Sequence, residues 1–168
     1  MAKSTFSGPV KSLSGFITAG ANATVSLTAD TTLTVDAHAG KILACNDADG
    51  KFTLPSINAT TPTDPTDPAQ ANNIGASFFF FIQTAATDLD ILTDGTDKFI
   101  GGLFTGKAAD AGKTFVPAAS NDVITLNGST KGGIAGSVIT ATIIAANVYG
   151  IEGVLIGSGT LATPFADA

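Results

Sequence analysis

The chain has 168 residues and a mass of 16.7 kDa, which is the size of a single domain. Fourteen acidic residues outnumber eight basic ones, so the net charge is −6 and the isoelectric point is about 4.4. This charge disfavours binding to phosphates and to anionic lipid, so we expect neither nucleic acid nor a membrane as a partner.

The residue types favour strands and turns over helices. Thirteen of the fourteen acids are Asp, which favours turns, and the chain is rich in Thr, Ile, Gly and Asn. Short apolar segments recur about every 8–12 residues, a spacing typical of sandwiches and barrels. The sequence therefore predicts an all-β fold, an antiparallel β-sandwich or β-barrel of roughly ten strands with an extended N-terminal arm.

Residues 1–20 are predicted to form this arm, and residues 21–168 a single β domain. The first 29 residues contain two lysines and no acid, which leaves a charge of −8 on the rest of the chain. Large apolar side chains are spaced along the arm: Phe6, Val10, Leu13 and Phe16. A frayed terminus is one interpretation. The other is an arm that docks on a neighbouring subunit through Phe6, Val10 and Phe16, because apolar groups on a flexible segment need a surface that buries them.

Apolar and polar residues alternate with a period of two from residue 23 onward, which predicts half-buried strands. The apolar members of the first two strands are Val25, Leu27, Leu33 and Val35. Two further strands are expected at residues 42–45 and 52–54, on either side of the turn-forming residues 46–50.

Residues 58–73 carry three prolines at three-residue spacing and predict an exposed, extended loop, with a contact to a partner as the alternative. The next segment, residues 77–84, contains four successive Phe residues. A continuous apolar run predicts a strand buried on both faces, in a core or at a subunit interface. Phe78 and Phe80 are therefore candidate contact residues.

An Asp94-Gly95 turn between residues 88–93 and 98–105 has the pattern of a β-hairpin. Residues 132–151 contain no charge and are long enough to span a bilayer. Their polar and β-branched residues favour two strands that reverse near Ala146-Asn147 over a transmembrane helix. The later strands are expected at residues 114–117, 123–126, 137–145 and 148–156.

Few residues suggest catalysis. The one cysteine, Cys45, lies in an apolar run and is interpreted as a core residue, and the one histidine, His38, is expected in a loop. No nucleophile with its base can be assembled from this pair. We therefore expect no enzymatic activity and no cofactor.

Two kinds of ligand motif are nearly matched. Residues 101–108 and 107–114 approach the phosphate-binding P-loop, but no apolar helix follows either of them. The acids within residues 46–49 and 88–97 offer oxygen ligands to calcium without the spacing of an EF-hand. We interpret the two P-loop-like segments as turns and the acids as solvated groups of turns and strands, with a weak cation site among these acids as the alternative.

The C-terminal third contains a set of short motifs: residues 125–133, Gly136, residues 148–153, residues 155–159 and residues 162–165. Together these motifs resemble small virion proteins of tailed bacteriophages. Residues 4–10 and Gly15-Phe16 also look like the start of such proteins from marine and cyanobacterial phages. Tyr149 stands where many members of this group have Trp.

The resemblance implies a capsid decoration (cement) protein that sits on the outer surface of a phage head and bridges neighbouring capsomers. The expected partners are the major capsid protein and other copies of this chain in a homotrimer, and the protein would be made in the cytoplasm of the host bacterium. The alternative is a fibre or knob module that binds a host-surface glycan or receptor through aromatic side chains at loop tips. The candidate capsid or subunit contacts are Phe6, Val10, Phe16, Phe78, Phe80 and Tyr149.

Overall fold

The computed structural model describes residues 23–61, 63, 72–108 and 110–168. Within these residues the chain forms twelve strands and one short helix, which confirms the predicted all-β class. The predicted arm at residues 1–20 and most of the proline-rich part of the loop at residues 58–73 lie outside the described residues.

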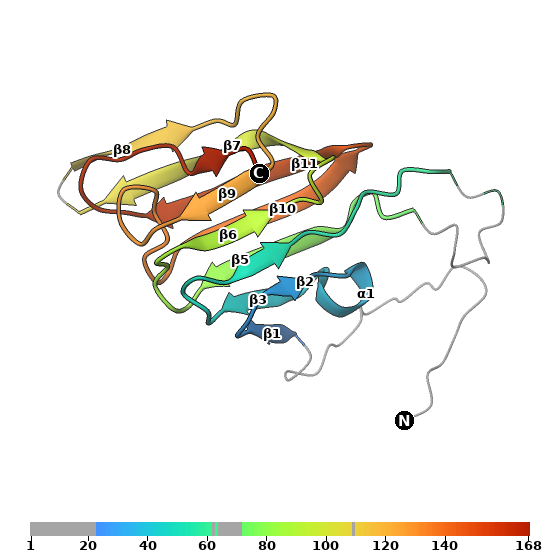
Figure 1. Cartoon of the computed structure of the whole chain (residues 1–168), viewed down its shortest axis with the longest axis horizontal. Helices are drawn as coiled ribbons and strands as arrows, with labels where there is room; N and C mark the ends of the chain where they lie inside the picture. Colours follow the sequence, from blue (N-terminus) through green and yellow to red (C-terminus); the bar gives the residue numbers. More distant parts are fainter. Residues whose placement is uncertain (1–22, 62, 64–71, 109) are drawn as a thin grey trace, which may run out of the picture.

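The strands form two sheets (Figure 1). The larger, which we call sheet A, has the strand order β1-β3-β5-β10-β11-β7-β8, and the smaller, sheet B, has the order β12-β9-β6-β4-β2. The strands of sheet A are β1 (Thr24–Leu27), β3 (Ile42–Cys45), β5 (Ser77–Ile82), β7 (Lys98–Lys107), β8 (Asp110–Phe115), β10 (Val138–Ala145) and β11 (Val148–Ile156). Those of sheet B are β2 (Thr31–Thr32), β4 (Lys51–Thr53), β6 (Leu89–Leu92), β9 (Val123–Leu126) and β12 (Phe165–Ala166).

Both sheets are mixed, so the antiparallel arrangement predicted from the sequence is wrong. The first six strands alternate between the sheets, with β1, β3 and β5 in sheet A and β2, β4 and β6 in sheet B. When the chain leaves one sheet, forms a strand in the other and comes back, the new strand runs parallel to the preceding strand of the same sheet. The pairs β1–β3, β3–β5, β2–β4 and β4–β6 are all parallel for this reason. Neither sheet closes on itself, so the described strands form no barrel.

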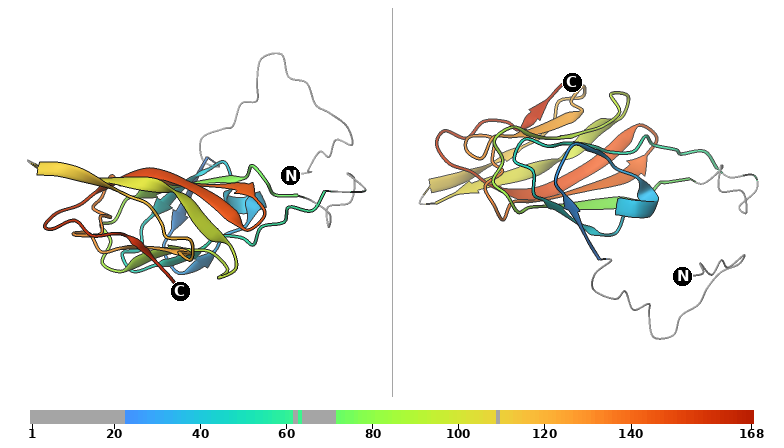
Figure 2. Two further views of the ribbon diagram at one scale, coloured as in Figure 1. Left: turned by 90° about the horizontal axis from the view of Figure 1, so that it is seen from above. Right: turned by 60° about the horizontal axis from the view of Figure 1, so that its bottom comes forward.

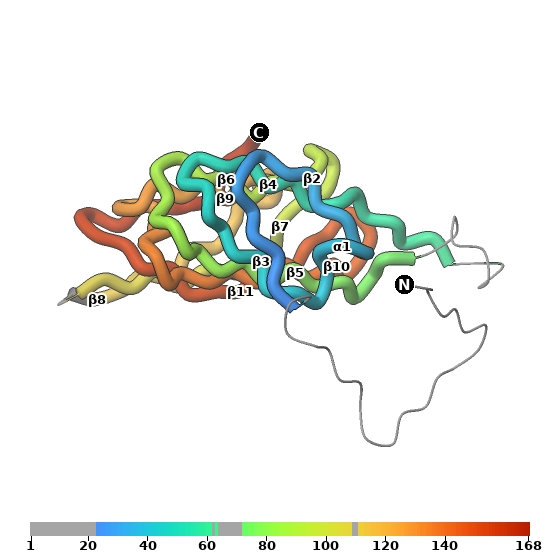
Figure 3. The backbone as a smooth tube through the Cα atoms, turned by 90° about the horizontal axis from the view of Figure 1, so that it is seen from below, coloured from blue at the N-terminus to red at the C-terminus, as the bar shows by residue number. Residues whose placement is uncertain are grey.

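The core lies between the two sheets, which Figure 3 shows as separate layers. On β5 the alternate residues Phe78, Phe80 and Ile82 are fully buried and face sheet B. The ring of Phe80 stacks on that of Phe52 from β4, with 6.5 Å between centroids, and so joins the two layers. One end of the β7–β8 hairpin projects beyond this two-layered body (Figure 2).

The charge-free residues 132–151 include β10 and the first four residues of β11, as their β-branched residues predicted. The two strands pair in antiparallel fashion and reverse at Asn147, whose φ of 60° lies in the left-handed region that Asn tolerates better than most residues. No helix in the described part of the chain has the length and apolar character needed to cross a membrane.

Two local predictions are wrong for identifiable reasons. Val35 begins a one-turn helix, α1 (Val35–His38), instead of continuing a strand, because Thr34 caps the helix by accepting a hydrogen bond from the Ala37 amide. The Asp94-Gly95 turn joins β6 of sheet B to β7 of sheet A, so these strands form no hairpin. The turn itself is present, and the Asp94 carboxylate accepts hydrogen bonds from the amides of Thr96 and Asp97.

The stem of the long loop after β4 is tied to the body by side chains. The Asn73 side chain donates to the Ser56 carbonyl and accepts from the Asn58 amide. The Tyr149 hydroxyl, on β11, donates to the Pro55 carbonyl. These bonds fix where the loop leaves the body and returns to it.

Candidate functional site

Large exposed apolar side chains gather on one surface of the molecule. Seven of the nine in the described residues lie on strands of sheet A, and none lies on sheet B. The other two, Ile74 and Val116, lie just before β5 and just after β8. We call this surface the outer face and define it by the seven strand residues: Ile42, Phe81, Ile100, Phe104, Ile144, Val154 and Ile156.

The outer face exists because sheet B covers only one side of sheet A. Successive side chains of a strand point to opposite sides, so every second residue of each sheet A strand turns away from the core. Strand register then aligns Phe81 on β5, Val138 on β10, Val154 on β11 and Phe104 on β7 as direct neighbours. The result is a continuous apolar row across four strands.

Three of the sequence-predicted contact residues lie in the interior instead. Phe78, Phe80 and Tyr149 have no solvent exposure, and each packs in the core between the sheets. In this fold they present no surface to a partner. The other three predicted contacts, Phe6, Val10 and Phe16, lie outside the described residues.

In a single copy of the chain, the Phe run of β5 is fully buried on just one of its two faces. Phe79 is half-buried, and Phe81 is 37% exposed on the outer face. The prediction of burial on both faces is therefore wrong for the single copy. Any further burial of Phe79 and Phe81 requires something outside the described residues to cover sheet A.

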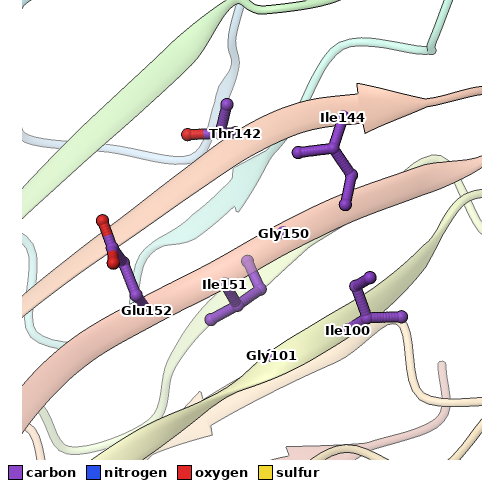
Figure 4. Close-up of a pocket in the computed structure, with 7 residues that line it drawn as sticks. All are labelled: Ile100, Gly101, Thr142, Ile144, Gly150, Ile151 and Glu152. Carbon is purple, nitrogen blue, oxygen red and sulfur yellow. The ribbon is translucent and has the colours of Figure 1, made fainter.

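A shallow groove of about 310 Å³ lies in the outer face across β10, β11 and β7 (Figure 4). Its floor is at Gly150, which has no side chain, and Ile144 and Ile100 stand on either side of it. A Cβ at position 150 would lie 3.2 Å from the Ile144 side chain, so glycine keeps the groove open.

The polar end of the groove holds Thr142 and Glu152. The Thr142 hydroxyl donates to the Ser77 hydroxyl at 3.0 Å, so this contact occupies its proton. Glu152 is exposed, and no lysine of the described residues lies within ion-pair distance of it. The groove therefore combines apolar walls with a single carboxylate that has no cationic partner in the described residues.

A separate acidic cluster supports the loop stem. Asp97 is 2% exposed and accepts a hydrogen bond from the Ile57 amide, and burial raises the pKa of its carboxyl despite that bond. The neighbouring Asp94 has a lowered pKa, chiefly because the Ser56 side chain hydrogen-bonds to it. Burial, together with these two carboxylates, also raises the pKa of Tyr149. These groups hold residues 55–57 in place: Asp97 and Tyr149 do so from the buried side, and Asp94 from the exposed side.

The remaining candidates for chemistry have structural surroundings. Cys45 is fully buried, and burial raises the pKa of its thiol to about 12, which leaves almost no nucleophilic thiolate near neutral pH. His38 ends α1, where a ring nitrogen accepts from the Thr34 amide at 2.9 Å. Cys45 therefore belongs to the core of the domain, and His38 belongs to the short helix α1.

The two P-loop-like segments lie in the β7–β8 hairpin and not at the start of a helix. The acids of residues 46–49 and 88–97 are divided among β6 and the turns around it, and Asp97 among them contacts the loop stem. Within the described residues, no three His, Cys, Asp or Glu side chains are grouped to hold a metal ion.

None of the seven residues of the outer face is among the six candidate contact residues predicted from the sequence, although Phe81 lies in the Phe run that contains two of those candidates. A signal for some of the seven was present, because residues 138–145 and 148–156 carry apolar side chains at both odd and even positions. A strand with one solvated face would instead alternate apolar and polar residues. What the sequence lacked was the identity of the face that the second sheet covers.

Comparison with protein-family models, with curated proteins and with solved structures gives no match for this chain.

Proposed function

We propose that this protein is a structural component of a bacteriophage virion, a capsid decoration protein that docks through the outer face of sheet A. The observation that carries the proposal is the concentration of exposed large apolar side chains on this one face. An exposed contiguous apolar surface on a folded domain is typical of an interaction site. The resemblance of the N- and C-terminal motifs to small phage virion proteins supplies the biological context.

The docking partner in this proposal is the major capsid protein on the outside of the head. Covering the exposed half of a side chain such as Phe81 or Val154 is worth about 1 kcal/mol, so a row of such residues contributes substantially to binding. The two open sheets form a sandwich-like platform whose outer face sits on the shell. The protein is made in the host cytoplasm and binds as a homotrimer, so each copy places one such face against neighbouring capsomers.

The fibre or knob alternative predicts aromatic side chains exposed at loop tips. Among the described residues the exposed large aromatic side chains are Phe81 and Phe104, and both lie within strands of sheet A, not at loop tips. Tyr149 is buried. We therefore do not propose glycan or receptor binding.

The test is co-sedimentation with capsids that lack the protein, with light scattering of the free protein in parallel. Saturable binding at a number that matches the capsid symmetry, by a trimer, is the expected result. The variant Phe81→Ser/Val154→Ser should bind at least tenfold more weakly while it stays folded with only a small loss of thermal stability, because both side chains are partly exposed in the free chain.

The matched control is Lys51→Ser, which changes an exposed residue of sheet B and should leave capsid binding unchanged. Absence of binding by the unaltered chain contradicts the decoration role. Equal binding by the double variant and the control rejects the outer face as the docking surface.

A further inference from the structure

We propose that the groove in the outer face binds the side chain of a lysine that projects from the docking partner. The identification of this partner as the major capsid protein rests on the proposed function, whereas the chemistry of the groove does not. Three properties of the groove carry the inference, which are its glycine floor, its apolar walls and its isolated carboxylate (Figure 4).

The groove has room for one extended side chain. Gly150 forms its floor, and strand register places Ile100 of β7 directly beside this glycine. A volume of about 310 Å³ is at the lower end of the range for small-molecule sites. A single aliphatic chain that lies between Ile100 and Ile144 therefore suits the groove better than a bulky ligand does.

The carboxylate at the end of the groove is isolated from other charges. Strand register gives Glu152 the neighbours Thr140 on β10 and Gly102 on β7, and neither carries a charge. Among the described residues, Lys98 and Asp122 form the one ion pair, and Glu152 takes no part in it. The charge of Glu152 is therefore left for a cation that a ligand supplies.

The polar end of the groove accepts hydrogen bonds and offers none. The Glu152 carboxylate is an acceptor only, and the Thr142 hydroxyl already donates its proton to Ser77. A lysine ammonium group has three donors and no acceptor. A ligand with this head group is therefore complementary to the polar end.

The lining of the groove favours lysine over arginine. None of the seven described residues that line it is aromatic, so a guanidinium group has no ring on which to stack. The two acceptors belong to different strands, Glu152 to β11 and Thr142 to β10, and the rotatable donors of an ammonium group can point to both. The aliphatic stem of the lysine then lies between Ile100 and Ile144 while its tip reaches the carboxylate.

The first experiment titrates the free chain with n-butylammonium, the analogue of a lysine side chain, and follows the Ile methyl resonances by NMR at constant ionic strength. The resonances of Ile100 and Ile144 should shift to saturation. That of Ile42, which lies on the same face outside the groove, should not shift. At low salt, n-butanol should bind about two- to fivefold more weakly, because it lacks the charge that forms an exposed ion pair.

Two variants and a control make the titration specific. Glu152→Gln should reduce the affinity for butylammonium to that for butanol. Gly150→Ala should weaken the binding of both ligands, because its Cβ would lie 3.2 Å from the Ile144 side chain and would narrow the groove. The matched control is Asp88→Asn, which removes an exposed carboxylate beside β6 of sheet B and should leave both affinities unchanged.

Three results of the titration overturn the proposal. If Glu152→Gln binds butylammonium as tightly as the unaltered chain does, the carboxylate does not select a cation. If the Ile42 resonance shifts as much as those of Ile100 and Ile144, the ligand adsorbs to the apolar face without using the groove. Resonances that change with protein concentration but not with added butylammonium assign the groove to a second copy of the chain.

The capsid assay tests the source of the lysine separately. Glu152→Gln should bind capsids about two- to fivefold more weakly at low salt, and this difference should disappear near 1 M salt. Equal capsid binding by Glu152→Gln and the unaltered chain at low salt overturns the assignment of the lysine to the capsid. Absence of capsid binding by the unaltered chain contradicts the proposed function alone, because the titration uses no capsid and still decides the chemistry of the groove.

Discussion

Phe80 and Phe81 are adjacent residues of one strand in opposite environments. Phe80 has no exposure and stacks on Phe52, whereas Phe81 is 37% exposed on the outer face. Phe80→Ala should lower the free energy of unfolding by about 3–5 kcal/mol, because it leaves a cavity between the sheets. Phe81→Ala should cost less than about 1 kcal/mol. Urea denaturation of both variants checks the difference, and equal losses would show that β5 is buried on both faces.

Asp97 links stability to pH. Its pKa in the folded chain is raised by burial, so folding favours the protonated form and the charged form opposes folding. The stability that this group contributes is complete below the unfolded pKa of about 3.9 and is lost as pH rises through the folded pKa.

Asp97→Asn removes this loss and retains a carbonyl to accept the Ile57 amide hydrogen bond. The variant should therefore unfold at higher urea concentration than the unaltered chain at neutral pH. Its advantage should shrink as the pH falls toward about 3.5. If Asp97→Asn instead unfolds at a lower urea concentration than the unaltered chain, by the same amount at neutral pH and near pH 3.5, burial of the Asp97 charge does not oppose folding.

Glycines on strands and turns differ in what a side chain would meet. At Gly95, whose φ is 89°, an added Cβ would have no other atom within 4 Å. Gly101 on β7 has a φ of 109°, and a Cβ there would lie 2.1 Å from the Ile151 carbonyl oxygen of β11.

Gly95→Ala should therefore cost about 1–3 kcal/mol of unfolding free energy from backbone strain alone. Gly101→Ala should cost more, because it also forces apart two paired strands near the centre of sheet A. Thermal unfolding of the two variants side by side measures this. Similar losses would show that β7 moves away from β11 at little cost.

The positions of most strands could be predicted from the sequence, but the pairing of the strands in sheets could not. The strands predicted at residues 137–145 and 148–156 correspond to β10 and β11, because β-branched runs with Glu152 as their one charge favour strands over helices. The prediction of a turn at Asp94-Gly95 is also confirmed, but the pattern did not show that this turn connects strands of two different sheets. A period of two carries no information about strand direction or sheet membership, so the parallel pairs could not be predicted.

The same limit applies to the candidate site. The four Phe residues of β5 predicted extensive burial, yet the pattern did not say which of them face the second sheet. Glu152 gave no signal of its own, because a lone acid on a strand is usually a solvated side chain. Only the register of β11 with β10 and β7 places it beside the groove.

The two sheets share one core, and this determines how the whole molecule unfolds. The buried cluster includes Phe80 and Tyr149 of sheet A with Phe52 and Ile124 of sheet B. Neither sheet can lose its partner without exposing these side chains. The chain should therefore unfold in one cooperative transition.

Tyr149 offers a direct measurement, since it is the only Tyr and the chain has no Trp. Its fluorescence should change at the same urea concentration as the far-ultraviolet circular dichroism, because it packs in the shared core and its hydroxyl binds the loop stem. Two separated transitions would show that the sheets unfold as independent units.

The strand order of sheet A also constrains synthesis on the ribosome. β10 and β11 occupy the middle of the sheet, between β5 and β7, yet they are made after the other five strands of sheet A. A nascent chain that ends before residue 138 carries both flanking strands with unpaired edges, which are prone to aggregate. Sheet A therefore acquires its two central strands only after its other five strands have been made, and chaperones that bind exposed strand edges should act on the nascent chain until then.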